Sequence, residues 1–113
     1  YEEMAHTLGW NYQLEKISVP ILLLAGTEGD FEMNLVIPEK EMKSMFSRIN
    51  APKAMARRKN AEHGDMLYQA DGYVTAWMMW QLQGDQEAAK AFTGERPELL
   101  NNSLYQEQKT EID

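Results

Sequence analysis

The feature that most constrains the fold is an apolar run at residues 17–26, with the sequence Ile-Ser-Val-Pro-Ile-Leu-Leu-Leu-Ala-Gly. Its β-branched and leucine residues do not alternate with polar ones, a pattern typical of a strand buried on both faces. Pro20 stands near the start of the run, where a missing N–H is tolerated. The sequence therefore predicts a strand of a parallel sheet, with helices covering both faces.

A helix and a second strand are expected next. Pro38 suits the first helical position, and acidic residues follow it in the first turn. An apolar stripe then recurs at helical spacing, at Met42, Met45, Phe46 and Ile49. Residues 53–59 are short and polar, which predicts a strand at the edge of the sheet. Strand, loop, helix and strand in this order form a βαβ unit with two parallel strands.

The rest of the chain predicts helices and a tail. Residues 66–82 are expected to form a largely buried helix that Asp65 can cap and that is weakened near Gly72. Gly84 should close it, and Asp85 should cap a short helix that ends near residue 92. We therefore expect one partial domain over residues 1–113, with a leading helical segment at 1–16, a βαβα core at 17–92, and a polar tail at 93–113. The tail is helical at most, and its last residues are expected to be mobile.

Composition argues against several classes of function. The formal net charge of −7 repels phosphate backbones, so we expect no nucleic-acid partner. The longest apolar run, residues 21–25, is too short for a membrane span. The chain has no cysteine, which excludes disulfides and is compatible with a reducing cytosol, so a cytoplasmic location is expected. No histidine pair or compact carboxylate loop predicts a metal site, and no cofactor is expected.

Two polar loops carry the candidate chemistry, and each follows a predicted strand. One is Gly-Thr-Glu-Gly-Asp-Phe-Glu at residues 26–32, and the other is Asn-Ala-Glu-His-Gly-Asp at residues 60–65. Because the carboxyl ends of neighbouring parallel strands meet at one edge of a sheet, we expect these loops to lie together. A carboxylate of the first loop and His63 could then form the orienting half of a Ser-His-Asp triad. Asp30 is the favoured carboxylate, and Glu28 and Glu32 are the alternatives.

The same residues resemble the α/β-hydrolase family. Val-Pro-Ile-Leu-Leu-Leu-Ala-Gly-Thr-Glu-Gly-Asp at residues 19–30 looks like the strand that ends in glycine before the triad acid, and Ala-Glu-His-Gly at 61–64 looks like the histidine loop. Residues 77–85 are similar to the terminal helix of dienelactone-hydrolase-like and cutinase-like members. The order, acid before histidine, matches the family. This resemblance covers residues 17–92 and implies the C-terminal βαβ-α portion of the fold, with Asp30 as acid, His63 as base, and a small ester as substrate of the intact parent.

Two departures limit what the resemblance implies. No G-x-S-x-G nucleophile elbow is present, because Ser18 precedes a strand, Ser44 and Ser47 lie on a predicted helix, and Ser103 lies in the tail. The oxyanion-hole segment is also missing, so these residues alone are expected to be inactive. In addition, the spacing from the glycine to Asp30 is one residue longer than in many members.

A chain that starts at Tyr1 is expected to be a piece of a longer protein. Without a neighbouring strand its first strand would present an apolar edge, so we expect the isolated chain to self-associate. The alternative reading is a non-catalytic α/β interaction or regulatory domain in which both loops are merely polar. A flavodoxin-like ligand-binding domain is a weaker option, because the sequence has no glycine-rich phosphate loop.

Overall fold

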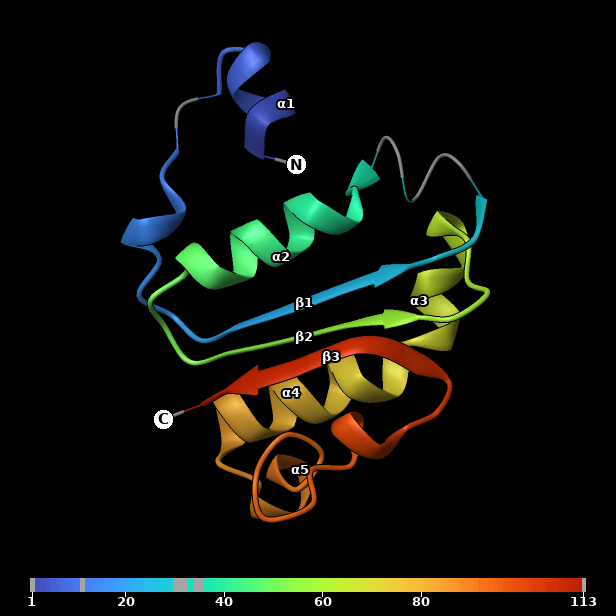
Figure 1. The fold of residues 1–113 in the computed structure, drawn as a ribbon. Coiled ribbons are helices and arrows are strands. Elements are labelled where there is room, and N and C mark those ends of the chain that lie inside the picture. Colours follow the sequence, from blue (N-terminus) through green and yellow to red (C-terminus); the bar gives the residue numbers. More distant parts are fainter. Residues whose placement is uncertain (1, 11, 30–32, 34–35, 113) are drawn as a thin grey trace.

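A mixed three-stranded sheet lies at the centre of the computed structural model, which describes residues 2–10, 12–29, 33 and 36–112 (Figure 1). The strands are β1 (Ile21–Gly26), β2 (Lys53–Arg58) and β3 (Tyr105–Glu111), in the spatial order β1-β2-β3. β1 and β2 are parallel, and β3 is antiparallel to β2. The expected parallel pair is therefore confirmed, and an antiparallel third strand is added to it.

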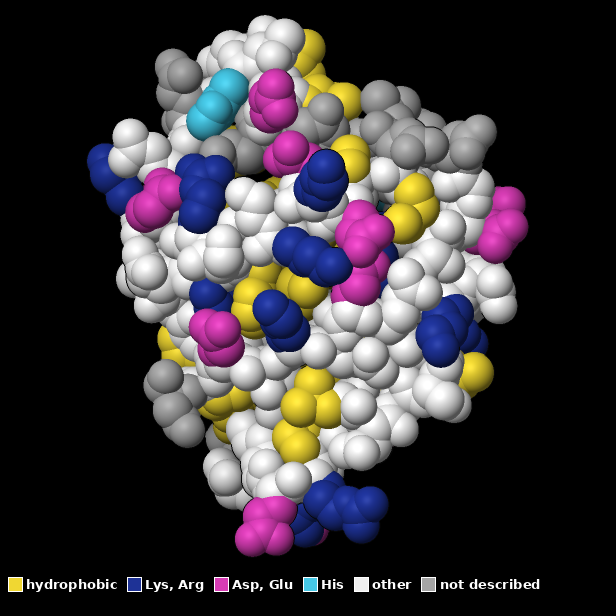
Figure 2. Space-filling view, viewed as in Figure 1, with side chains coloured by type: hydrophobic (Ala, Val, Ile, Leu, Met, Phe, Trp, Pro, Cys, Tyr) yellow, Lys and Arg dark blue, Asp and Glu magenta, His cyan; other side chains and the backbone are white. Residues whose placement is uncertain are grey.

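Helix α2 (Glu39–Arg48) covers one face of the sheet, as its apolar stripe predicts. Its Met42 and Phe46 are buried against Ala25 and Met55, which belong to the two parallel strands. Pro38 precedes the helix at the N-cap rather than at the first helical position. Acidic and basic side chains are interspersed on the molecular face seen in Figure 2.

The other face of the sheet is covered by the helix α4 (Asp71–Gln83) with two short helices beside it, α3 (Met66–Gln69) and α5 (Gln86–Ala89). Trp77 of α4 packs edge-on against Phe92, with ring centroids 5.0 Å apart. Leu22 and Leu24 of β1 pack against this aromatic cluster, while Leu23 packs on the side of α2. The first strand thus has apolar contacts on both faces, as its sequence predicts.

Element ends confirm some predictions and correct others. Gly84 closes α4 in the left-handed conformation, and the Asp85 side chain accepts hydrogen bonds from two amides of α5, both as expected. The single helix expected at 66–82 is instead divided at Ala70, and the Asp65 side chain caps nothing. The leading segment holds α1 (Glu2–Thr7) and a 3₁₀ helix, Leu14–Lys16.

The first strand begins later than predicted. β1 starts at Ile21 rather than at residue 17, and the Ile21 amide donates its hydrogen bond to the Pro52 carbonyl, 3.0 Å away. Pro20, the residue before the strand, has no N–H to contribute to a ladder. The proline therefore marks where strand pairing begins.

The prediction for the tail was wrong in its most important part. Residues 105–111 form strand β3, which pairs with β2 along its length. Only Tyr105 of this strand is fully buried, and the pairing shifts register between Met55 and Arg57. Glu107 adopts a positive φ of 57° at this bulge. Every residue of β3 after Tyr105 is polar, so the sequence has no apolar alternation by which this strand could be recognised.

The prediction that residues 53–59 form an edge strand was also wrong, because β2 is the central strand. Lys53 and Arg57 suggested exposure, yet they are only 5% and 0% exposed. The Lys53 ammonium group donates hydrogen bonds to the carbonyls of Phe46 and Ile49, at the end of α2. A buried cation is tolerated when it meets such partners, here the orphan carbonyls of a helix end.

Arg57, the other buried cation of β2, pairs with a buried carboxylate. Its Nε atom lies 3.4 Å from a carboxylate oxygen of Glu107, whose side chain is only 9% exposed. The other carboxylate oxygen of Glu107 lies 3.8 Å from the ammonium group of Lys43. Lys43 also donates a hydrogen bond to the Glu39 carboxylate, which raises the pKa of Lys43 and so favours its charged form. The bulge in β3 therefore carries a carboxylate between two cations of other elements.

Replacing Arg57 should be far more damaging than replacing its neighbour. Arg57→Met leaves the Glu107 carboxylate buried without its main counter-ion, and we expect the free energy of unfolding to fall by about 3–5 kcal/mol. The matched variant Arg58→Met removes a partly exposed guanidinium and should cost less than about 1 kcal/mol. Urea denaturation followed by circular dichroism measures both values. Equal losses in the two variants would contradict the central role of the buried Arg57–Glu107 pair.

Candidate functional site

The loops that follow β1 and β2 are joined by hydrogen bonds at one end of the sheet. The Asn60 amide donates to the Thr27 hydroxyl oxygen at 2.9 Å, and the Glu28 amide donates to the Ala61 carbonyl at 2.9 Å. Asn60 has a positive φ of 60°, a conformation that asparagine tolerates better than most residues. The expectation that the two polar loops lie together is thus confirmed for the described residues.

The loop junction depends on a glycine. A Cβ atom placed on Gly26 would lie 2.1 Å from the Ala61 carbonyl oxygen, far inside van der Waals contact. The last residue of β1 must therefore lack a side chain for the second loop to approach this closely. The Gly26 that the sequence places before the candidate acid thus has a direct steric role.

Arg57 also holds the first loop at both of its ends. Its guanidinium donates one hydrogen bond to the Gly26 carbonyl, at 2.8 Å, and another to the Ile37 carbonyl. Gly26 begins the loop and Ile37 follows it, so one buried side chain of the neighbouring strand fixes where the loop leaves the sheet and where it returns. Sequence reasoning missed this residue, and its only signal was a charged residue inside a predicted strand.

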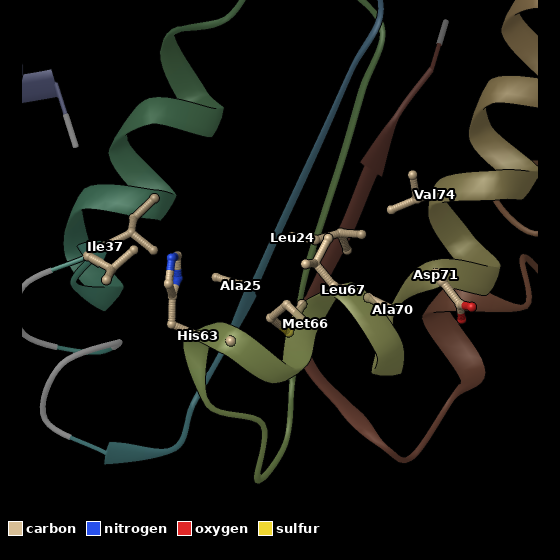
Figure 3. Close-up of a pocket in the computed structure, with 11 residues that line it drawn as sticks. Leu24, Ala25, Ile37, His63, Met66, Leu67, Ala70, Asp71 and Val74 are labelled. Atoms are coloured by element: carbon tan, nitrogen blue, oxygen red, sulfur yellow. The ribbon is translucent and has the colours of Figure 1, made fainter.

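His63 opens a 3₁₀ helix, His63–Asp65, that leads directly into α3. Its side chain is exposed. Figure 3 shows the imidazole ring directed between Ile37 and Ala25, the residues that lie before α2 and near the end of β1. The histidine predicted as the base is therefore accessible and lies at the carboxyl end of the parallel strands.

A cavity of about 540 Å³ opens beside this histidine (Figure 3). Leu24 and Ala25 of β1 form part of its wall, and α3 and α4 form another part. Its lining is largely apolar and comprises Leu24, Ala25, Val36, Ile37, His63, Gly64, Met66, Leu67, Ala70, Asp71 and Val74. The sequence did not predict this cavity, because three separate chain segments create it.

The structure describes only some of the other predicted site residues. Asp30 and Glu32 lie outside the described residues, so the distance from the favoured acid to His63 stays a prediction. Glu28 is exposed and joins the loop junction through its amide. None of the four serines lines the cavity. Ser44 and Ser47 lie on α2, as expected, and are exposed. Within the described part of the chain, the site therefore holds a histidine and a shaped apolar wall.

Other kinds of site find no support among the described residues. No group of three or more histidine, cysteine, aspartate or glutamate side chains in this part of the chain could hold a metal ion. No helix in the same residues combines the length and the apolar character needed to cross a membrane. The sequence matches no model of a known protein family and no curated protein sequence. Any statement of function must therefore come from the site itself.

The close contact at Gly26 gives a direct test of the loop junction. Gly26→Ala places a methyl group on the Ala61 carbonyl oxygen, and we expect the free energy of unfolding to fall by roughly 1–3 kcal/mol or more. Gly72→Ala is the matched control, because Gly72 lies in α4 with open space around it, and the added methyl should stabilise the protein by about 0.5–1 kcal/mol. Thermal denaturation compares the two variants. A neutral Gly26→Ala variant would contradict the packed junction.

Proposed function

We propose that this chain is the C-terminal segment of a serine hydrolase with an α/β fold. It supplies the triad histidine, His63, and the triad acid, Asp30, to an active site that cleaves small esters or related acyl compounds. The nucleophilic serine and the oxyanion donors come from residues outside this sequence. The observation that carries the proposal is the hydrogen-bonded junction between the loop that bears Asp30 and the loop that bears His63.

Three further features support the proposal. The two loops follow parallel strands that are direct neighbours, and ligands of such sheets gather beyond the carboxyl ends of the strands. The acid loop precedes the histidine loop in the chain, as in α/β-hydrolases. His63 is exposed at the wall of an apolar cavity, where the apolar part of a small ester could lie.

The chemistry assigned to these residues is that of a general base and its orienting partner. The Asp30 carboxylate accepts a hydrogen bond from Nδ1–H of His63, so that Nε2 is the nitrogen that accepts a proton. Nε2 takes the proton of the serine hydroxyl while the serine oxygen attacks the ester carbonyl. The same proton then passes to the departing alcohol oxygen. Arg57 serves this arrangement as a positioning residue, because it fixes both ends of the acid loop.

The pairing of Asp30 with His63 can be tested without a substrate. Long-range ¹H–¹⁵N correlation spectra distinguish the two neutral tautomers of a histidine. We expect His63 to be held as the Nδ1–H tautomer in the unmodified chain, and Asp30→Asn should shift it towards a mixture. Glu28→Gln is the matched control and should change nothing.

The possible results separate the competing readings. If Glu28→Gln or Glu32→Gln shifts the tautomer instead, the acid is misassigned while the catalytic proposal stands. If no carboxylate variant changes His63, the proposed triad fails. The non-catalytic interaction domain is then the better account of the chain.

The isolated chain should be inactive, because it holds a base and an acid without a nucleophile at the cavity. We expect the hydrolysis of p-nitrophenyl acetate by the unmodified chain to equal that by His63→Ala, within the slow background caused by surface groups. Absorbance of released nitrophenolate measures both rates. Turnover that disappears in His63→Ala would show that the chain contains its own nucleophile, and the segment proposal would need revision.

A further inference from the structure

The two outer strands of the sheet differ sharply in how their free edges are protected. β3 carries glutamate and lysine side chains and a bulge at Glu107, devices that discourage further pairing. β1 consists of Ile-Leu-Leu-Leu-Ala-Gly and carries no charge. Among the described residues β1 pairs only with β2, so no described strand covers its second edge along residues 21–25.

The cavity beside His63 extends along this open edge. Leu24 packs on the side of α4, whereas Ala25 packs on the side of α2, and yet both residues line the same cavity. Neighbouring residues of a strand point to opposite faces of the sheet. A cavity that touches both must therefore reach around the edge of the strand, where a further strand would lie.

Apolar side chains on the neighbouring helices continue this open surface. Val74 of α4 is 47% exposed and lines the cavity, and Met78 follows one turn later at 49% exposure. Leu67 of α3, at 79% exposure, also lines the cavity. We call the β1 edge together with Leu67, Val74 and Met78 the edge surface. Leu67 and Val74 thus share the cavity with β1, and Met78 adds a further exposed apolar side chain one turn along α4.

We propose that, in the isolated chain, a second copy covers the edge surface. The two β1 strands pair antiparallel about a two-fold axis perpendicular to the sheet and form a six-stranded sheet. A two-fold axis brings the same surface of both copies together, so Val74 and Met78 face their counterparts and apolar groups meet apolar groups. The two β3 strands, whose edges are protected, then become the two edge strands of the six-stranded sheet.

The area of the edge surface fits a weak dimer. A strand of six residues is about 20 Å long, and the sheet together with the α4 layer adds a depth of roughly 25 Å, so about 500 Å² of each copy would be buried. The total of about 1,000 Å² is near the lower limit for a specific interface. We therefore expect a reversible monomer–dimer equilibrium in the micromolar range. The inference does not depend on the proposed catalytic role of His63.

Sedimentation equilibrium of the full chain tests the proposal. The unmodified chain should change from monomer to dimer across the micromolar range, without larger species. The double variant Val74→Lys/Met78→Lys should weaken the dimer at least about tenfold, because lysine ammonium groups would have to leave water at the interface. Leu104→Lys, at an exposed residue just before β3, is the matched control and should leave the equilibrium unchanged.

Hydrogen exchange then identifies the pairing. Because the Ile21 amide is bonded towards β2, the amides of Leu22 and Leu24 point to the open edge, given the alternation of a strand. Their exchange should slow as the concentration rises, in the unmodified chain and not in the double variant. The proposal is overturned by a chain that stays monomeric throughout, as expected if only an upstream strand fits this edge. It is also overturned by a dimer without added protection at Leu22 and Leu24, or by a dimer that the double variant leaves intact.

Discussion

The buried guanidinium of Arg57 joins most parts of this structure. From the central strand it contacts the Glu107 carboxylate of β3, the last carbonyl of β1, and the Ile37 carbonyl just before α2. Desolvating a charge is costly, so it is tolerated only where several polar partners surround it. Here those partners come from chain segments about twenty to fifty residues away. The order of the strands and the path of the first loop are consequently linked through one side chain.

The parts of the fold that follow from local chemistry were predictable. The uninterrupted apolar run predicted β1, and the stripe of Met42 and Phe46 predicted α2. Gly84 predicted the end of α4, and Asp85 predicted the cap of α5. The errors arose where long-range partners override local character. Lys53 and Arg57 have the composition of a surface strand, and only the tertiary fold supplies the carbonyls and the carboxylate that bury them. In β3 the residues after Tyr105 are all polar, so no apolar alternation reveals the strand.

The candidate site, too, has parts that follow from local sequence and parts that depend on long-range contacts. Parallel strands place their following loops together, so the meeting of the two polar loops could be expected, and with it the accessible position of His63. The apolar wall beside His63 could not be expected from the sequence. This wall combines β1 with the residues before α2 and with α3 and α4, which the sequence predicted as a single helix. Asp30 lies outside the described residues. The pairing of acid and base therefore stays a prediction, on which the hydrolase proposal depends.

The direction of β3 has a practical consequence. Because this strand runs back along β2, Glu111 lies opposite Lys53, at the start of β2, while His63 follows the other end of that strand. Figure 1 shows the C-terminal end of the chain and α3 at opposite ends of the sheet. An affinity tag, fluorophore or immobilisation linker attached beyond Ile112 would therefore leave the histidine loop and its cavity open to solvent.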